Sequence, residues 1–383
     1  MIRSVSKNSL HAGRMKGKDD LMKPELEQLC QEYIANRDAV QKAFRWDNGT
    51  LFSVCANIFC ACGKTADPER LKECRKIIKG HTGFRSKFRS KKVRSILAGM
   101  LSLAENPEER MNLANDTFLL LKRQFKKTEY LVLTAFLLSD LTDRALTDET
   151  VSRGKEIYSL MNRKHRILTD KTDSVFAMLM AFSGIPAEDL TEETETCYQA
   201  LKKKFSGGGA QTAAQILSMA DGTPEDKVQR VTDLCEALRE AGIKYGRSAE
   251  LAPLAALSLA DTPLTALTEE IRDVDEFLKT RKGFEGSKDE DQAQRAMYAV
   301  MIVSDQYANT DQVNITVMTN TIDMLIAKQQ ASRLSFCLNA LQFLARLIPE
   351  TDKSSETGKA SEPEAKTEAG TVPEETEKAE NKE

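Results

Sequence analysis

Four cysteines and one histidine lie close together in the chain and are residue types that bind zinc: Cys55, Cys60, Cys62, Cys74 and His81. A structural zinc site usually takes paired ligands across a tight knuckle, whereas Cys55 and Cys60 fall within one apolar helical pattern. In the repeat described below, the positions of Cys55, Cys60 and Cys74 are filled elsewhere by small or apolar residues. Only Cys62 lies outside this comparison. These cysteines are therefore predicted to be core residues, and no metal site is predicted.

Residues for nucleophilic catalysis or for cofactor binding are not identifiable. The three histidines, His11, His81 and His165, have no recognisable catalytic partner, and nothing indicates a strand-to-helix nucleophile elbow. Gly207-Gly208-Gly209 precedes a helical pattern, and amides at a helix N-terminus can bind phosphate. However, no Lys-Ser or Lys-Thr follows the glycines, so a flexible turn is the favoured interpretation. No catalytic residue and no cofactor are predicted.

An acidic residue recurs where several apolar helical segments end: Glu105, Asp140, Asp221, Asp261 and Asp305. Negative charge is unfavourable at the C-terminal end of a helix, so the acid does not serve helix stability. The favoured interpretation is that each carboxylate accepts backbone N–H bonds in the following turn. The alternative is a row of carboxylates along one edge that holds a basic peptide or cations.

The densest charge in the chain is the basic segment from Lys79 to Arg94, which contains no acid. Its cations form the candidate partner- or anion-binding site: Lys79, Arg85, Lys87, Arg89, Lys91, Lys92 and Arg94. Phe84 and Phe88 lie between them, and such a combination can bind a phosphate backbone. A similar stretch, Lys282 to Asp289, keeps a phenylalanine at Phe284 but lacks the charge excess. Phe84 is therefore predicted to be structural. A solvated basic loop is the favoured interpretation of this segment, and a binding site is the alternative.

A repeat of 35 to 44 residues must position these side chains. The repeats align on the residue predicted to end the first helix of each unit: Cys62, Glu105, Asp140, Gly184, Asp221, Asp261 and Asp305. The residue before it is always Ala or Ser, and the residue four before it is always large and apolar. A small residue at a fixed register position indicates a close helix crossing.

The second helix of each unit is predicted to be amphipathic. It starts at a capping residue followed by acid, as in Asp67-Pro68-Glu69, Asn106-Pro107-Glu108, Thr191-Glu192, Thr223-Pro224-Glu225 and Thr268-Glu269. Most of these helices end in Lys or Arg. If they stack in parallel, the acidic starts form one edge and the basic ends form another.

These patterns predict an all-α protein with an array of about seven helical hairpins, either α-solenoid-like or a compact helical stack. Capping helices are predicted at Pro24–Phe44 and, at the other end, at residues 311–330 and 332–348. Residues 1–22 are predicted to be a flexible N-terminal segment, and residues 23–349 form the helical-repeat domain. Residues 350–383 carry eleven acidic and five basic side chains, a net charge of −6, and are predicted to be a disordered acidic tail.

The chain has no apolar run of the roughly 20 residues that a membrane-spanning helix needs, and no secretion signal is recognisable. Its eight cysteines are therefore expected to be reduced thiols. We expect a cytoplasmic protein without membrane contact.

Several segments resemble an uncharacterised bacterial domain-of-unknown-function family, number four thousand and three of its series. The resemblance is carried by Leu71 to Lys79, Phe84 to Ser90, Ile96 to Ala104 and Tyr130 to Leu138. It covers roughly Pro24 to Ile348 and implies a helical fold. The family has no assigned activity, so the resemblance implies no catalytic residue.

The sequence therefore favours a non-catalytic interaction or scaffold protein whose partner is another protein, because helical arrays commonly present an extended surface. Nucleic-acid binding through residues 79–94 is the alternative, and an enzyme with an unrecognised pocket is the third. The sequence does not indicate the oligomeric state.

Overall fold

The computed structural model describes residues 22–307, except residues 46, 48, 92, 140–147, 167–168, 170–172, 182, 184 and 246–250. The predicted N-terminal segment up to residue 21, the predicted closing helices and the predicted acidic tail lie outside the described residues. The chain divides into two units, residues 1–348 and 349–383, and every described residue belongs to the first.

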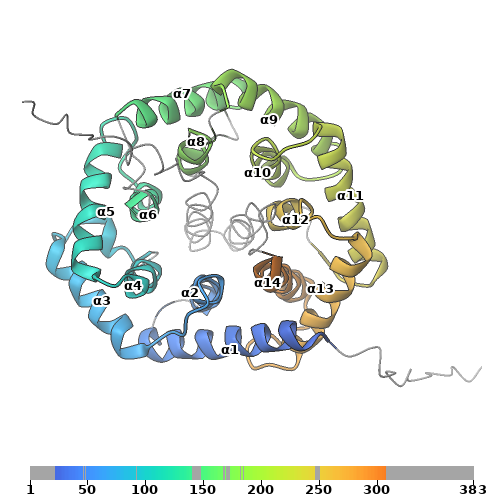
Figure 1. Ribbon diagram of the computed structural model, residues 1–383, viewed down its shortest axis with the longest axis horizontal. Helices are drawn as coiled ribbons and strands as arrows, with labels where there is room; N and C mark the ends of the chain where they lie inside the picture. The colour runs from blue at the N-terminus through green and yellow to red at the C-terminus, as the bar shows by residue number, and fades with distance from the viewer. Residues whose placement is uncertain are drawn as a thin grey trace, which may run out of the picture. The chain divides into compact units, whose positions relative to one another are not determined.

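The described residues form α-helices in two concentric layers (Figure 1), with one short 3₁₀ helix, η2 (Lys87–Arg89), and no strand. The outer helices are α1 (Pro24–Phe44), α3 (Pro68–His81), α5 (Pro107–Leu121), α7 (Asp148–Lys164), α9 (Ala187–Leu201), α11 (Pro224–Glu240) and α13 (Leu264–Lys279). The inner helices are α2 (Gly49–Ala61), α4 (Arg94–Leu103), α6 (Glu129–Leu138), α8 (Asp173–Ala181), α10 (Gly207–Leu217), α12 (Leu251–Leu257) and α14 (Asp289–Tyr307). The predicted all-α fold is confirmed.

The two layers follow from two kinds of helix sequence. Outer helices bury one stripe, as α3 buries Leu71, Cys74 and Ile78 and exposes the charged residues between them. Inner helices are more fully buried, and all nine residues of α8 are buried. Each outer helix packs on the inner helix that follows it in the chain, and most neighbouring inner helices pack on one another.

The ring of hairpins is closed by contacts between α1 and the last hairpin, α13 and α14. Lys23 Nζ lies 2.6 Å from the carboxylate of Glu270 in α13. Tyr33 is fully buried, and its ring centroid lies 6.5 Å from that of Phe284 and 6.4 Å from that of Tyr298. Helix α1 was predicted to cap an array, but it is the outer helix of the first hairpin and contacts the last one.

The predicted starts of the outer helices are confirmed where Asp, Asn or Thr precedes proline. The side chains of Asp67, Asn106 and Thr223 accept hydrogen bonds from backbone N–H groups in the first turns of α3, α5 and α11. Helices α9 and α13 instead begin four residues before the predicted Thr191 and Thr268. Both threonines lie inside their helices, where their hydroxyls donate to the carbonyls of Glu188 and Leu264.

A basic side chain near the start of several outer helices satisfies the carbonyls at the end of an inner helix. Arg70 donates to the carbonyl of Ser102 in the last turn of α4, at 2.7 Å, and to that of Ala104 just after this helix, at 2.5 Å. Arg230 donates to Ala260 and Thr262 after α12, both at 2.6 Å. These carbonyls have no partner within their own helix, so a guanidinium group stabilises each helix end. Ala104 and Ala260 are the small residues that recur immediately before the aligned position of the repeat. This recurrent position thus supplies one of the carbonyls that accept from the guanidinium group.

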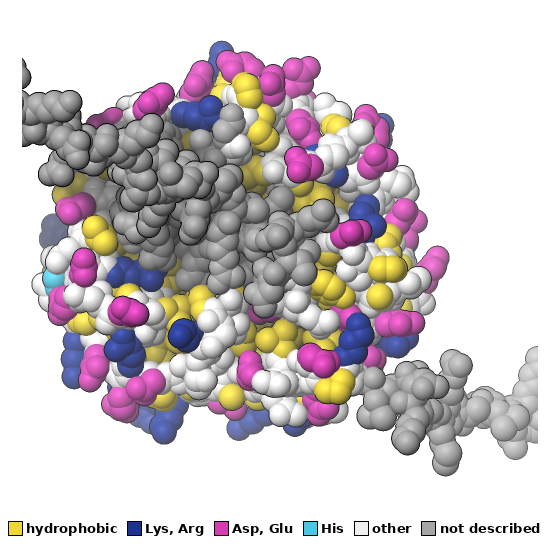
Figure 2. Space-filling model, viewed as in Figure 1, with side chains coloured by type: hydrophobic (Ala, Val, Ile, Leu, Met, Phe, Trp, Pro, Cys, Tyr) yellow, Lys and Arg dark blue, Asp and Glu magenta, His cyan; other side chains and the backbone are white. Residues whose placement is uncertain are grey.

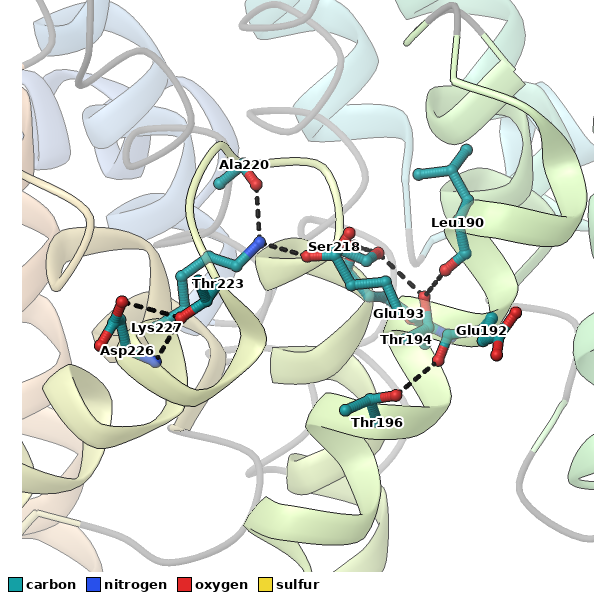
Figure 3. Close-up of polar contacts among 11 residues, drawn as sticks. Leu190, Glu192, Glu193, Thr194, Thr196, Ser218, Ala220, Thr223, Asp226 and Lys227 are labelled. Atoms are coloured by element: carbon teal, nitrogen blue, oxygen red, sulfur yellow. Dashed lines mark hydrogen bonds and ion pairs between the residues drawn. The ribbon is translucent and has the colours of Figure 1, made fainter.

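Lys227 in α11 performs the same role at the end of α10, as Figure 3 shows. Its ammonium group donates to the carbonyl of Ala220 at 2.7 Å and pairs with Glu193 of α9, and its side chain is 4% exposed. The hydroxyl of Thr194 in α9 donates to Ser218 at 2.9 Å. Buried polar groups therefore connect successive hairpins and are hydrogen-bonded, as burial requires.

The predicted separation of acidic starts and basic ends into two edges is wrong. The outer helices follow one another along the circumference (Figure 1), so the end of one approaches the start of the next. Arg123, just after α5, lies 3.1 Å from Asp148 at the start of α7, and His81 at the end of α3 pairs with Glu108 near the start of α5. Figure 2 likewise shows acidic and basic side chains interspersed around the visible face.

Replacement of Phe284 by alanine is expected to lower the free energy of unfolding by about 3–5 kcal/mol, because the ring that packs between α1 and α14 is lost. The matched control is Phe84→Ala, at the equivalent Gly-Phe position of the α3–α4 loop, with an expected effect within about 0.5 kcal/mol. Urea unfolding of both variants measures the difference. Equal destabilisation would contradict the role of Phe284 in closing the ring.

Arg230→Met is expected to destabilise the protein by about 1–3 kcal/mol, because carbonyls after α12 lose their donor. Arg239→Met changes an exposed arginine of the same helix and serves as the control, with little expected effect. Thermal unfolding of the two variants gives the comparison. If the two melting temperatures are equally lowered, the guanidinium group of Arg230 does not stabilise this helix end.

Candidate partner-binding surface

The α3–α4 loop, residues 82–93, is held in one conformation by bonds to α3 and by its own aromatic side chain. Arg89 donates to the carbonyls of Lys79 and Thr82 and to the hydroxyl of Thr82. Phe88 is 2% exposed, and its ring centroid lies 5.3 Å from that of Phe118 in α5. The side chain of Ser86 accepts a bond from the Phe88 N–H at the start of η2. The loop is therefore preorganised.

Three of the seven predicted site cations hold the fold together. Arg89 fixes the loop, as described above. Lys87 lies 2.9 Å from the carboxylate of Glu129, the first residue of α6. Arg94, the first residue of α4, lies 2.6 Å from the carboxylate of Asp47, whose side chain is 3% exposed. All three cations therefore already have partners within the fold, and the side chain of Lys87 remains 41% exposed.

The structure places three other predicted cations on the surface. Lys79, Arg85 and Lys91 are exposed and form no ion pair with the described residues, whereas Lys92 lies outside them. Lys76, one turn before Lys79 in α3, is also exposed. The cations of the basic segment thus fall into two groups, those that bind other parts of the fold and those that face solvent.

Phe84 is 89% exposed and is one of only two large hydrophobic side chains exposed in the described part of the chain, with Leu119 at 47%. The prediction that Phe84 is structural is wrong. Its counterpart Phe284 is 6% exposed and packs against Tyr33 and Tyr298. In the longer α3–α4 loop, Phe88 fills the core, which leaves Phe84 outside between exposed cations. The sequence repeat gave no indication that Phe84 and Phe284 would differ in exposure.

The Arg94–Asp47 pair shows why the structural cations are costly to remove. Burial alone would raise the pKa of Asp47, but hydrogen bonds from Arg94 and Ser95 outweigh it and hold this pKa below its ordinary value. The pair joins the segment between α1 and α2 to the start of α4. It therefore supports the position from which the α3–α4 loop projects.

Three of the four cysteines considered for metal binding lie in the core, and Cys62 is partly buried. Cys55, Cys60 and Cys74 are buried, and burial raises the pKa of the Cys74 thiol to about 11. Only a thiolate is a good nucleophile or metal ligand, so these side chains act as small apolar residues. In the described ranges, no group of three or more His, Cys, Asp or Glu side chains is arranged to hold a metal ion.

The other candidate residues are dispersed around the ring. His81 pairs with Glu108, and His165 pairs with Glu195 of α9. Gly207 to Gly209 form the first turn of α10 itself, where the sequence predicted a turn. Of the recurrent acids, Glu105, Asp221 and Asp261 are exposed, Asp305 is buried inside α14, and Asp140 lies outside the described residues. They do not form one uniform row.

A cleft of about 680 Å³ lies where the first and last hairpins meet. Two of its arginines are already bound to the protein. Arg37 donates to the carbonyl of Lys282 at 2.7 Å and packs over the ring of Phe284. Arg295 pairs with Asp275 at 2.9 Å and donates to the carbonyl of Phe284. Sequence reasoning did not find this cleft, because its walls adjoin only after the ring closes.

The fold and this surface define an all-α ring of helical hairpins with one exposed aromatic side chain in a basic loop. The family model described as "Protein of unknown function (DUF4003)" matches residues 36–331, and the chain belongs to this family. No curated protein and no solved structure shows significant similarity to the chain. None of the described helices is both long enough and apolar enough to span a membrane.

Asp47→Asn is expected to destabilise the protein at neutral pH but progressively less in acid. The lowered pKa means that the carboxylate stabilises the fold above the unfolded-state pKa of about 4 and loses this effect as the pH falls through the folded-state pKa. The difference in free energy of unfolding between wild type and variant, measured with urea, should therefore decrease as the pH falls from about 5 to about 2. In an Arg94→Met background the gap should depend less on pH. A constant gap in both backgrounds would contradict this account.

Proposed function

We propose that this protein is a non-catalytic interaction protein that binds another protein through the α3–α4 loop, with Phe84 as the central contact. The observation that carries the proposal is the 89% exposure of Phe84. A phenylalanine gains about 1.5–3 kcal/mol when it passes from water into an apolar site, so its exposure is unfavourable unless a partner covers it. Aromatic and arginine side chains are also enriched at protein interfaces.

The rigidity of the loop supports the same proposal. Arg89, Ser86 and Phe88 fix the backbone on both sides of Phe84. A side chain presented on a fixed backbone loses little further conformational freedom when it binds. Among the described residues, Leu119 is the only other exposed large hydrophobic side chain, which suits a scaffold with one localised contact.

Nucleic-acid binding is the second candidate, because an exposed aromatic ring next to Lys79, Arg85 and Lys91 could stack on a base while the cations contact phosphates. It is less well supported. Binding through the phosphate backbone gains strength from each neutralised phosphate, and the fold occupies Lys87, Arg89 and Arg94. Three of the seven predicted cations are therefore already engaged within the fold.

A pull-down with the full chain, from a lysate of cells that carry the native gene, tests the proposal. Wild type, Phe84→Ala and the control Leu119→Ala are compared with and without nuclease. We expect a reproducible protein that survives nuclease treatment, is retained by Leu119→Ala and is lost with Phe84→Ala. Recovery of nucleic acid that disappears with Phe84→Ala would support the second candidate, and no difference between the three baits would contradict both.

A further inference from the structure

We infer that the partner receives Phe84 in an apolar pocket whose rim is acidic, so that the partner is an acidic protein surface and not a nucleic acid. This inference rests on the proposed function and adds the chemistry of the partner. It follows from three features of the α3–α4 loop: its uniform charge, its single aromatic ring and its open backbone.

The charge around Phe84 has one sign. No Asp or Glu occurs between Glu73 and Glu105 in the sequence. Two acids approach the loop from neighbouring helices: Glu108 is hydrogen-bonded to His81, and Glu129 is paired with Lys87. Among residues 74–104, the exposed Lys and Arg side chains without an ion pair to described residues are Lys76, Lys79, Arg85 and Lys91, and no acidic side chain lies in this range. A partner surface must therefore be acidic around the pocket to be complementary.

The single ring favours a pocket over a strand of nucleic acid. Surfaces that bind single strands stack successive bases on several aromatic side chains. Phe84 is the only aromatic among the large exposed hydrophobic side chains of the described residues. One ring on a rigid support matches the geometry of a protein hot spot, in which an aromatic group fills a desolvated pocket inside a polar rim.

The backbone near Phe84 allows a partner to approach closely. A Cβ atom added to Gly80 or Gly83 would meet no atom within 4 Å, so solvent lies beside both residues. The N–H of Ser86 donates to the carbonyl of Gly83 at 2.9 Å, and this turn directs Phe84 outwards. A pocket on the partner can therefore enclose the Phe84 ring from the side of Gly80 and Gly83, where this protein leaves open space.

A photo-crosslinking experiment in cells tests the chemistry of the partner directly. The full chain carries p-benzoylphenylalanine in place of Phe84 or, as the matched control, in place of the exposed Leu119. We expect crosslinks to one protein from position 84 only, and the crosslinked peptide to contain an excess of Asp and Glu. Combined Lys79→Glu and Arg85→Glu substitutions should reduce the yield, whereas Lys202→Glu with Lys203→Glu, on the distant α9–α10 loop, should not.

The crosslinked segment, made as a synthetic peptide or as its folded domain, then gives the affinity. We expect Phe84→Ala to weaken binding by roughly 10- to 100-fold and Leu119→Ala to leave it unchanged. Binding to wild type should weaken as the salt concentration rises, and less so for the Lys79→Glu, Arg85→Glu variant. Thermal unfolding of each variant confirms that it is folded.

The outcomes separate this inference from the proposed function. A specific protein crosslink from position 84 whose peptide is neutral or basic, or whose binding does not respond to salt, overturns the acidic-partner inference and leaves the proposed function standing. Crosslinks to nucleic acid, to another copy of this chain only, or to the same proteins from positions 84 and 119 overturn both.

Discussion

The packing of α1 against α13 and α14 is the constraint on which the rest of the structure depends. Each hairpin buries its sides against two neighbours, and an open array would leave an unburied side at each end. Closure removes both ends, as it removes the edges of a β-barrel. The same circular arrangement (Figure 1) brings the end of one outer helix to the start of the next, where Arg123 pairs with Asp148.

Local features of the fold could be predicted from the sequence because local interactions produce them. The spacing of Leu71, Cys74 and Ile78 defines the buried stripe of α3, and Asp67 caps the same helix. Ring closure could not be predicted in this way. It depends on contacts such as that between Arg37 and Lys282, and a repeat pattern indicates which hairpins are neighbours in sequence but not whether the first meets the last.

The candidate surface was only partly predictable for a related reason. Composition located the basic segment, but it could not separate Arg89, which binds three acceptors within the fold, from Arg85, which faces solvent. Phe84 and Phe284 share a preceding glycine and differ in environment, because Phe88 takes the core position in one loop and no second phenylalanine does so in the other. The availability of a side chain is thus decided by the tertiary contacts of its neighbours.

Closure also has a consequence for synthesis on the ribosome. Lys23 and Glu270 are 247 residues apart, so α1 emerges long before the helices that complete its environment. At typical elongation rates of about 5–20 residues per second, this interval is about 10–50 s. During that time Tyr33, fully buried in the finished ring, lacks its partners Phe284 and Tyr298. The first hairpin can pack early on its successors, but its remaining apolar side stays open to chaperones or to misassembly until the last hairpin is made.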